Sequence, residues 1–389
     1  MFRTFTTLML ALSSVTSVSA AVMARQNQVT HKLVVGAPFQ VLTADFDGKK
    51  FSITGNHTAV GTGPSWLLYK DPTHLYAVNE NANDTSLFSL SADLNNPTVT
   101  SATNGSSGVV FLEFNSDKTR IVGTAYGAET IDVWDVTADD GSLKLLKTLP
   151  VPGVPSPGQA AHRPHQAILD PTGRFFVIPN LGGDTLLVLD SKDDRYEITS
   201  NATLPAGSGP RHGGFLTRGD THYYAVATEI SNELFLYELQ YADDRIEFAE
   251  IQRQSTYGTN PPANATTAAA AELVVARNQR DVYVSNRISG NETDSIAHFR
   301  FGAAGQLDFA GSVSSGGLRP RMFSLSKDEK QTLAFVANQG GDAGLVAFHR
   351  CPSSGALHSK PAGTLASSEL IPFSLATEEL VGPQFVLEI

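Results

Sequence analysis

The stretch PSWLLYKDPTHLYAVNE, residues 64–80, sets a pattern that decides the fold of this chain. It starts with a proline, continues with an apolar run, turns through Asp71-Pro72-Thr73, and ends in a second apolar run followed by polar residues. Short runs rich in aromatic and aliphatic residues, separated by Asp, Pro and Thr, are typical of paired antiparallel strands. The stretch therefore predicts two adjacent strands joined by a tight turn.

The same pattern returns five more times along the chain. The further copies are VVFLEFNSDKTRIVGTAYG at 109–127, PHQAILDPTGRFFVIPNLG at 164–182, PRHGGFLTRGDTHYYAVATE at 210–229, AELVVARNQRDVYVSNR at 271–287 and PRMFSLSKDEKQTLAFVANQ at 320–339. Their starts lie roughly 45 to 60 residues apart, the period of one four-stranded propeller blade. We therefore expect an all-β protein with the blades arranged around one axis.

The two ends of the chain supply the strands that six repeats leave over. Residues 32–37, 39–46 and 51–54 predict three strands near the start, and QFVLEI at 384–389 predicts one at the end. Joining them in one blade would pair the strand edges that an open ring leaves exposed. We expect a seven-bladed propeller over residues 21–389, with one blade closed by both chain ends. Because such a ring pairs its own edges, we expect a monomer.

The first twenty residues, MFRTFTTLMLALSSVTSVSA, have the features of a secretory signal peptide. One arginine precedes an apolar stretch that ends in Val18-Ser19-Ala20, a small-x-small cleavage site. This apolar stretch is too short for a membrane span, and we expect none. We expect a secreted protein, in the extracellular space or the cell wall. Six sequons predict N-glycosylation at Asn56, Asn83, Asn104, Asn201, Asn264 and Asn291.

Charge and missing motifs exclude several classes of function. The formal net charge of −11 argues against binding to nucleic acid or to anionic membranes. Cys351 is the only cysteine, so no internal disulfide can form, and its context predicts a structural or idle role. We find no HExxH motif, EF-hand loop, GxSxG elbow or glycine-rich phosphate loop. We expect neither a metal nor a cofactor.

Polar residues gather where the repeats begin and end, and these positions share one place in a propeller. The first strand of each blade lines the channel, so its start and the end of the second strand meet at one axial face. Arginines there can bind carboxylates or phosphates, and His and Glu can act as acid or base. The predicted catalytic residues are His165, Arg211, Glu229 and Arg287, and the predicted substrate-binding residues are His212, Arg321 and Gln339.

Each of these residues also has a purely structural interpretation. A histidine in a strand can be a satisfied core residue, and an arginine at a turn can cap a carbonyl. Glu229 can pair with a neighbouring arginine and do nothing else. The set is more informative than its members, because all of them fall at equivalent positions of the repeat.

The motifs PSWLLY, PHQAILDPTGRFFVIPNLGGD, GPRHGGF, TEISNEL, VSNR and PRMFSLS…VANQ resemble those of the seven-bladed lactonase propellers. That family includes bacterial 6-phosphogluconolactonases and fungal 3-carboxy-cis,cis-muconate lactonising enzymes. The resemblance implies site roles for His165, Arg211, Glu229 and Arg287. Two positions depart from the family pattern: Asn180 stands where a carboxylate is common, and His162-Arg163-Pro164-His165 replaces an HPH-like pair.

The resemblance implies a cofactor-independent enzyme that acts on a small carboxylate or lactone, either by hydrolysing a lactone or by forming one as a carboxymuconate cyclase does. In either direction His165 or Glu229 would move the proton while arginines hold the negative charge. The predicted secretion supports a second hypothesis, a non-catalytic glycoprotein that binds through one propeller face, since fold alone does not decide function.

Overall fold

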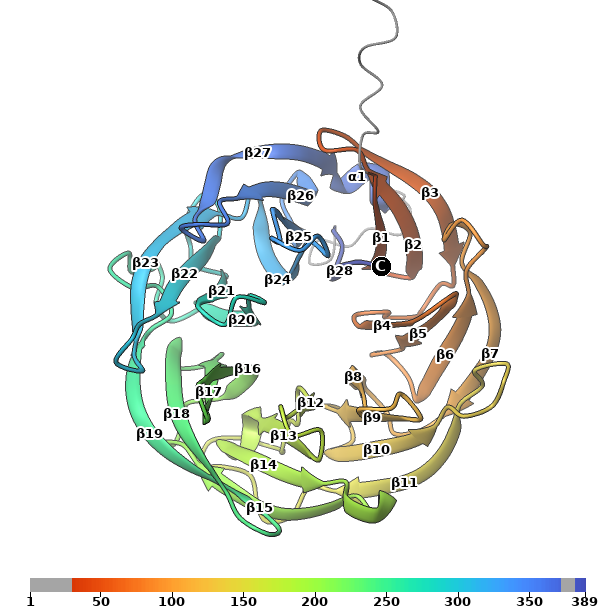
Figure 1. The fold of residues 1–389 in the computed structure, drawn as a ribbon. Helices are drawn as coiled ribbons and strands as arrows, with labels where there is room; N and C mark the ends of the chain where they lie inside the picture. The colour runs from red at the N-terminus through yellow and green to blue at the C-terminus, as the bar shows by residue number, and fades with distance from the viewer. Residues whose placement is uncertain (1–29, 372–381) are drawn as a thin grey trace, which may run out of the picture.

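The computed structural model describes residues 30–371 and 382–389, which form seven four-stranded antiparallel sheets around one axis (Figure 1). The sheets are blades 1 to 7 in the order in which their second strands occur in the chain. The predicted all-β, seven-bladed propeller is confirmed. The predicted signal peptide, residues 1–20, lies outside the described residues.

The strands run from the axis outward in each blade. Blade 1 contains β28 (Phe385–Glu388), β1 (His31–Ala37), β2 (Gln40–Phe46) and β3 (Phe51–Thr58). Blade 2 contains β4 (Leu67–Lys70), β5 (His74–Val78), β6 (Asp84–Ser89) and β7 (Thr98–Asn104). Blade 3 contains β8 (Val109–Phe114), β9 (Arg120–Ala125), β10 (Thr130–Asp135) and β11 (Lys144–Pro150). Blade 4 contains β12 (Ile168–Leu169), β13 (Phe175–Asn180), β14 (Thr185–Asp190) and β15 (Glu197–Thr203).

The remaining three blades follow the same order. Blade 5 contains β16 (Pro210–Arg218), β17 (Thr221–Thr228), β18 (Glu233–Tyr241) and β19 (Ile246–Ser255). Blade 6 contains β20 (Ala269–Val275), β21 (Asp281–Arg287), β22 (Ser295–Phe301) and β23 (Leu307–Ser314). Blade 7 contains β24 (Leu318–Leu325), β25 (Leu333–Gly340), β26 (Ala343–Arg350) and β27 (Leu357–Ala366). The described helices are short: η1 (Leu181–Gly183), η2 (Lys192–Asp194) and α1 (Ser367–Leu370).

Both chain ends build blade 1, as the sequence predicts. The C-terminal β28 pairs antiparallel with β1, and Val386 lies opposite Val35 in the register. The side chains of His31 and Glu388 add an ion pair, with 2.8 Å between Nδ1 and Oε1. Phe385 and Val386 are almost completely buried, so the tail is part of the core.

The hydrophobic core lies mainly between neighbouring blades. The largest cluster joins residues of blades 7, 1 and 2 and includes Phe335, Phe46 and Leu75, all fully buried. Blades 1 and 2 approach so closely that a Cβ on Gly36 would lie 2.0 Å from the carbonyl oxygen of Pro64. A larger residue at position 36 would therefore push the two blades apart.

Blade 4 differs from the others at its inner edge. Its innermost strand β12 has only two residues, and the preceding chain touches β13 through a single bridge between Pro164 and Asn180. The segment that carries His165 is therefore a loop, held by this bridge and by side-chain hydrogen bonds to Arg163 N and His162 N. It was expected to begin a regular strand.

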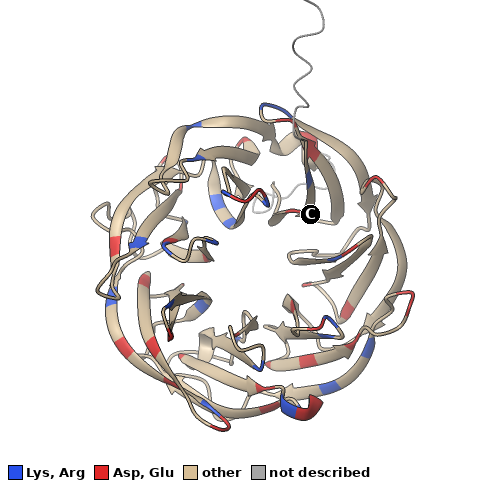
Figure 2. Ribbon diagram, in the orientation of Figure 1, with Lys and Arg blue, Asp and Glu red and all other residues tan. Residues whose placement is uncertain are grey.

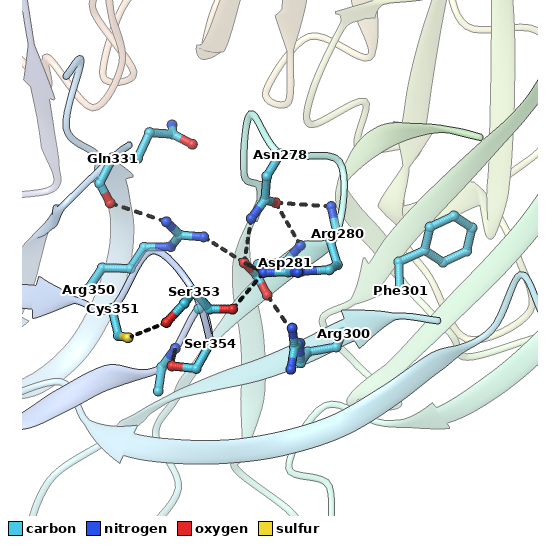
Figure 3. Close-up of polar contacts among 12 residues, drawn as sticks. Asn278, Arg280, Asp281, Arg300, Phe301, Gln331, Arg350, Cys351, Ser353 and Ser354 are labelled. Atoms are coloured by element: carbon cyan, nitrogen blue, oxygen red, sulfur yellow. Dashed lines mark hydrogen bonds and ion pairs between the residues drawn. The ribbon is translucent and has the colours of Figure 1, made fainter. Parts of the chain in front are cut away.

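Buried Asp281 in β21 ties blade 6 to blade 7 (Figure 3). Its Oδ2 accepts hydrogen bonds from Arg350 Nη2 at 2.6 Å and Asn278 Nδ2 at 2.7 Å. Its Oδ1 lies 3.0 Å from His298 Nε2. Burial alone would raise the pKa of Asp281, but these hydrogen bonds and the charge of Arg350 outweigh it and lower the pKa to about 2.

No helix in the described part of the chain has the length and apolar character needed to cross a membrane.

Candidate active site

Charged side chains converge at one end of the propeller axis, here called the axial face. Figure 2 shows basic residues on the inner strands β16 and β24, next to the axis. The face is built where inner strands begin and second strands end, as the repeat predicts. We use the name mouth cluster for Arg211, Glu229, Arg287, Arg321 and Glu80.

Bulges in three inner strands position the functional side chains. The pairing of β16 with β17 shifts at Arg211, and that of β24 with β25 shifts at Arg321. The pairing of β20 with β21 shifts across Ala271 and Glu272. A bulge inserts an extra residue and re-aims a side chain that would otherwise point to the other face of the sheet.

Glu229 is the centre of the mouth cluster. Its Oε2 lies 2.8 Å from Arg211 Nε and 2.9 Å from Arg287 Nη2, so one oxygen joins two arginines. Arg211 comes from β16, Arg287 ends β21, and Glu229 directly follows β17. The side chain of Arg211 is 3% exposed, while that of Glu229 is 28% exposed. A ligand at this face therefore meets Glu229 and Arg287 before it meets Arg211.

A second ion pair completes the mouth cluster. Arg321 Nη2 lies 2.7 Å from Glu80 Oε2, and the pair borders a pocket of about 230 Å³ that also includes Asn81 and Gln384. The sequence analysis missed Glu80 as a site residue. Its signal was present, because Glu80 ends its repeat in blade 2 just as Glu229 ends its repeat in blade 5.

Three further side chains form a hydrogen-bonded chain beside the mouth cluster. His165 Nδ1 lies 3.0 Å from His212 Nε2, and His212 Nδ1 lies 3.0 Å from Glu272 Oε1. All three residues are buried. We call them the histidine relay. They come from blades 4, 5 and 6.

The relay changes the interpretation of His212, which was predicted to bind substrate. Both of its ring nitrogens are engaged within the protein, and the residue is 2% exposed. The rings of Trp66 and Phe111 pack edge to face against it at 5.7 and 5.6 Å between centroids. His212 is thus held by contacts within the protein, and its predicted role in substrate binding stays a prediction. Glu272, its carboxylate partner, was not predicted, although it is the second residue of its repeat, just as Arg211 and Arg321 are of theirs.

Burial and the arginines set the charge states of these groups. Burial, then the charge of Arg211, holds the pKa of His165 well below its usual 6.5. Burial also lowers the pKa of His212, although Glu272 opposes this effect. Both imidazoles are thus neutral at pH 7.

Burial has the opposite effect on the carboxylates of the mouth cluster, but the charges of the arginines outweigh it. Burial would raise the pKa of Glu229, but the charges of Arg287 and Arg211 outweigh it and lower that pKa. The pKa of Glu80 is lowered in the same way, by Arg321 against the effect of burial. Burial, together with nearby Arg287, lowers the pKa of Arg211 to about 9. At pH 7 the mouth cluster therefore holds two carboxylates among three guanidiniums.

Tyr126 and Arg163 border His165. The ring of Tyr126 packs edge to face against His165 at 5.7 Å, and the guanidinium of Arg163 stacks on Tyr126 at 4.6 Å. Asn180, one of the two departures from the family pattern, accepts a hydrogen bond from Arg163 N at 2.9 Å. Its amide nitrogen lies 3.1 Å from His162 Nδ1. Asn180 thus helps to fix the loop that carries His165. His162 contacts Asn180 and is not part of the histidine relay.

Gln339, at the end of its repeat, was predicted to bind substrate. It is buried in β25, and within the described residues the structure gives no hydrogen bond or ion pair between its side chain and the mouth cluster. Its predicted role in substrate binding stays a prediction. Among residues 30–371 and 382–389, no three His, Cys, Asp or Glu side chains gather as a metal ion would require.

The six sequons all lie at the surface. Asn56, Asn104 and Asn201 are on the outermost strands β3, β7 and β15, and the other three are in loops. All six asparagines are exposed. Their glycosylation stays a prediction.

Comparison with known proteins agrees with this fold. Residues 30–369 match the model of the family described as "Lactonase, 7-bladed beta-propeller". A protein of Arthroderma benhamiae named "Probable 6-phosphogluconolactonase" is 29% identical over 259 residues, and the match covers 64% of each chain. The chain therefore spans just under two thirds of that relative's length.

Solved structures share the architecture at lower sequence identity. The periplasmic gluconolactonase of Pseudomonas aeruginosa superposes with a TM-score of 0.75 and 21% identity, covering 92% of this chain and 99% of its own. A protein from Lactobacillus plantarum gives a TM-score of 0.74 and 22% identity, covering 87% and 97%. Because the family model matches nearly all of the described propeller, this chain belongs to the seven-bladed β-propeller lactonase family.

Proposed function

We propose that this protein hydrolyses small lactones that carry a negative charge, at the axial face. The observation that carries the proposal is the position of His165: a buried imidazole, bound through Nδ1 to His212, that is kept neutral by burial and by the charges of arginines of the mouth cluster. A neutral imidazole can take a proton from water, and guanidiniums can stabilise the oxyanion that forms. Family membership supports the same chemistry.

The reaction divides into two steps. His165 Nε2 takes a proton from a water molecule while the water oxygen attacks the lactone carbonyl carbon, which gives a tetrahedral oxyanion. The ring C–O bond then breaks, and the proton on His165 passes to the departing alkoxide. The products are a hydroxyl group and a carboxylic acid, which loses its proton to solvent to give the carboxylate, and His165 returns to its neutral state.

The mouth cluster supplies the charges for these steps. Arg287 and Arg321 have side chains 12% and 15% exposed, so they can meet the anionic group of a substrate or its oxyanion. Glu229 and Glu80 hold these guanidiniums in place and can accept hydrogen bonds from substrate hydroxyls. Arg211 is too buried for a direct contact, and it supports the site through its charge.

Lactone formation from an unsaturated polycarboxylate is a second candidate function. It is favoured by the three arginines, which exceed the two carboxylates of the mouth cluster and leave positive charge for a substrate with several carboxylates. This reaction is an addition to an alkene and not the reverse of hydrolysis. One substrate carboxylate would form a C–O bond to one carbon of the C=C bond, while a protonated His165 or Glu229 delivers a proton to the other carbon.

The experiment measures turnover of a lactone panel, including gluconolactone and 6-phosphogluconolactone, above the spontaneous rate, and of 3-carboxymuconate. The test variant is His165→Asn, and the matched control is His358→Asn, an exposed histidine of β27. We expect lactone hydrolysis in the wild type and the control, with a loss of about 10²–10⁴-fold in His165→Asn. Equal turnover in all three proteins would contradict the proposal, and turnover of 3-carboxymuconate alone would favour the second candidate.

We also propose that the protein is secreted and glycosylated. The proposal is supported by the leader-like residues 1–20 and by the exposed sequons. Expression of the full chain in a eukaryotic host should give protein in the medium, with a mass that falls on treatment with an N-glycosidase. If the secreted protein binds glycans or proteins but turns over no substrate, the binding-protein hypothesis replaces the enzymatic one.

A further inference from the structure

His165 can act as a base only if the correct ring nitrogen is free of a proton. Its Nδ1 is engaged with His212, so the base must be Nε2. A neutral imidazole carries one proton, on either nitrogen, and isolated histidine does not fix which one. The site therefore needs interactions that favour the tautomer with this proton on Nδ1.

The bond between the two imidazoles holds one proton, and Glu272 decides which ring donates it. Glu272 Oε1 lies 3.0 Å from His212 Nδ1 and also accepts the Leu273 N–H at 3.1 Å, so this oxygen is an acceptor. His212 must then carry its proton on Nδ1. Its Nε2 is left with a lone pair, which can only accept. His165 must donate from Nδ1.

We propose that Glu272 and His212 are positioning residues that hold His165 in the Nδ1–H tautomer, with the Nε2 lone pair directed to the reacting water. This inference rests on the proposed lactone hydrolysis. Neither Glu272 nor His212 touches substrate. The arrangement has the logic of a carboxylate that orients a catalytic imidazole, extended by a second imidazole.

The relay also balances the charge that catalysis creates. When His165 takes a proton, the imidazolium faces Arg211, Arg287, Arg321 and neutral His212, with Tyr126 at its edge. These arginines oppose the positive charge. Through His212, the negative charge of Glu272 stabilises the imidazolium until its proton is transferred to the alkoxide.

The structure also argues against a relay that serves packing alone. The three residues come from three blades, and Glu272 sits at a bulge that brings its carboxylate to His212. Glu272 Oε2 has no hydrogen-bond partner among the described residues. Burying a carboxylate with one oxygen unpaired costs stability. An apolar side chain would fill the same place without this cost.

The first experiment measures tautomers directly and needs no activity. The ¹⁵N shifts of the imidazoles are recorded by NMR on the wild-type full chain at pH 7.5, with His165→Asn and His212→Asn spectra for assignment. We expect both His165 and His212 to carry their proton on Nδ1. A proton on His165 Nε2 overturns the proposal, whatever the activity.

The second experiment measures the pH dependence of kcat/KM in Glu272→Gln. The matched control is Glu113→Gln, another carboxylate on an inner strand, β8, outside the mouth cluster and the relay. We expect kcat to fall about 10–100-fold in Glu272→Gln with little change in KM. The acid limb of the kcat/KM profile should move to lower pH, because protonated His165 loses the stabilising negative charge of Glu272. The control should keep the wild-type limb.

The outcomes separate the two hypotheses. If the wild type turns over no lactone but shows both Nδ1–H tautomers, the proposed function fails and the relay stands. If the wild type is active but Glu272→Gln keeps the wild-type rate and acid limb, the relay is overturned and the proposed function stands. If Glu272→Gln does not fold, the wild-type tautomers alone decide.

Discussion

Arg211 Nε lies 2.8 Å from Glu229 Oε2, and the same oxygen lies 2.9 Å from Arg287 Nη2. One carboxylate oxygen thus holds together two guanidiniums from different blades that would otherwise repel each other. This contact links site geometry to ring stability, because it joins β16 and β21 across a blade boundary.

Glu229→Gln should lower both turnover and stability. The change leaves Arg211 and Arg287 close together with no counter-charge. Because Glu229 is partly exposed, we expect a loss of about 2 kcal/mol rather than the larger value for a fully buried pair. Urea unfolding at pH 7 measures it, with the exposed Glu250→Gln as control. The lowered pKa of Glu229 means that this stabilisation is present above pH 4.5 and lost as the pH falls further. An unchanged stability difference between pH 6.5 and pH 3.5 would contradict this.

Arg321→Lys should weaken substrate binding more than it slows chemistry. Lysine keeps the charge but cannot contact Glu80 and a substrate anion with the planar geometry of arginine. We expect KM to rise about tenfold with kcat within a factor of about three. Steady-state kinetics on the best lactone of the panel measure both, with Arg253→Lys on outer strand β19 as control. A fall in kcat at constant KM would instead place Arg321 in the chemical step.

Phe385→Ala should destabilise the whole ring. Phe385 is 1% exposed in β28 and packs against Trp66, with 5.0 Å between ring centroids. Large-to-small changes of buried aromatics cost about 3–5 kcal/mol. We expect a single cooperative thermal transition at lower temperature, with Val60→Ala, a residue 74% exposed, as the neutral control. Loss of residues 384–389 with no fall in Tm would refute closure by the tail.

The His31–Glu388 pair should make the closure of blade 1 depend on pH. The hydrogen bond from His31 to Glu388 raises the pKa of His31 above 6.5, although burial opposes it. A raised folded-state pKa gives stability that is present below pH 6.5 and lost as the pH rises through the higher folded value. We expect Glu388→Gln to lower Tm more at pH 5.5 than at pH 8.5. A larger effect at pH 8.5 would reverse the sign and contradict the assignment.

Asp281→Asn should loosen the contact between blades 6 and 7. The folded pKa of about 2 lies below the usual 3.8, a difference worth about 2 kcal/mol for this fully buried group. This contribution to the free energy of unfolding is present above pH 3.8 and is lost as the pH falls toward 2. The difference between wild type and Asp281→Asn in urea unfolding should therefore shrink from pH 6 to pH 2.5. The exposed Asp244→Asn serves as control, and a constant difference would contradict the prediction.

The sequence predicted most of the fold and part of the site. Repeats of similar length, each with two apolar runs and a turn, predict blades, and leftover strands at both ends predict a shared one. The repeat also places Arg211, Glu229, Arg287 and Arg321 at one axial face. Glu80 could have been found by the same rule. Glu272 begins its repeat as Arg211 and Arg321 begin theirs, so the same rule could have placed it at this face. Its contact with His212 could not be predicted, because that contact depends on how blades 5 and 6 pack together.

The sequence by itself determined the number of blades, the closure of the ring and the end of the axis at which the charges gather, because strand periodicity and repeat length are local properties. Only the tertiary structure decided which side chains touch. Bulges at Arg211, Glu272 and Arg321 turn these residues toward partners, and an irregular loop places His165 against His212. A one-residue shift in strand pairing reverses the face to which a side chain points, and that shift depends on contacts between blades far apart in the chain.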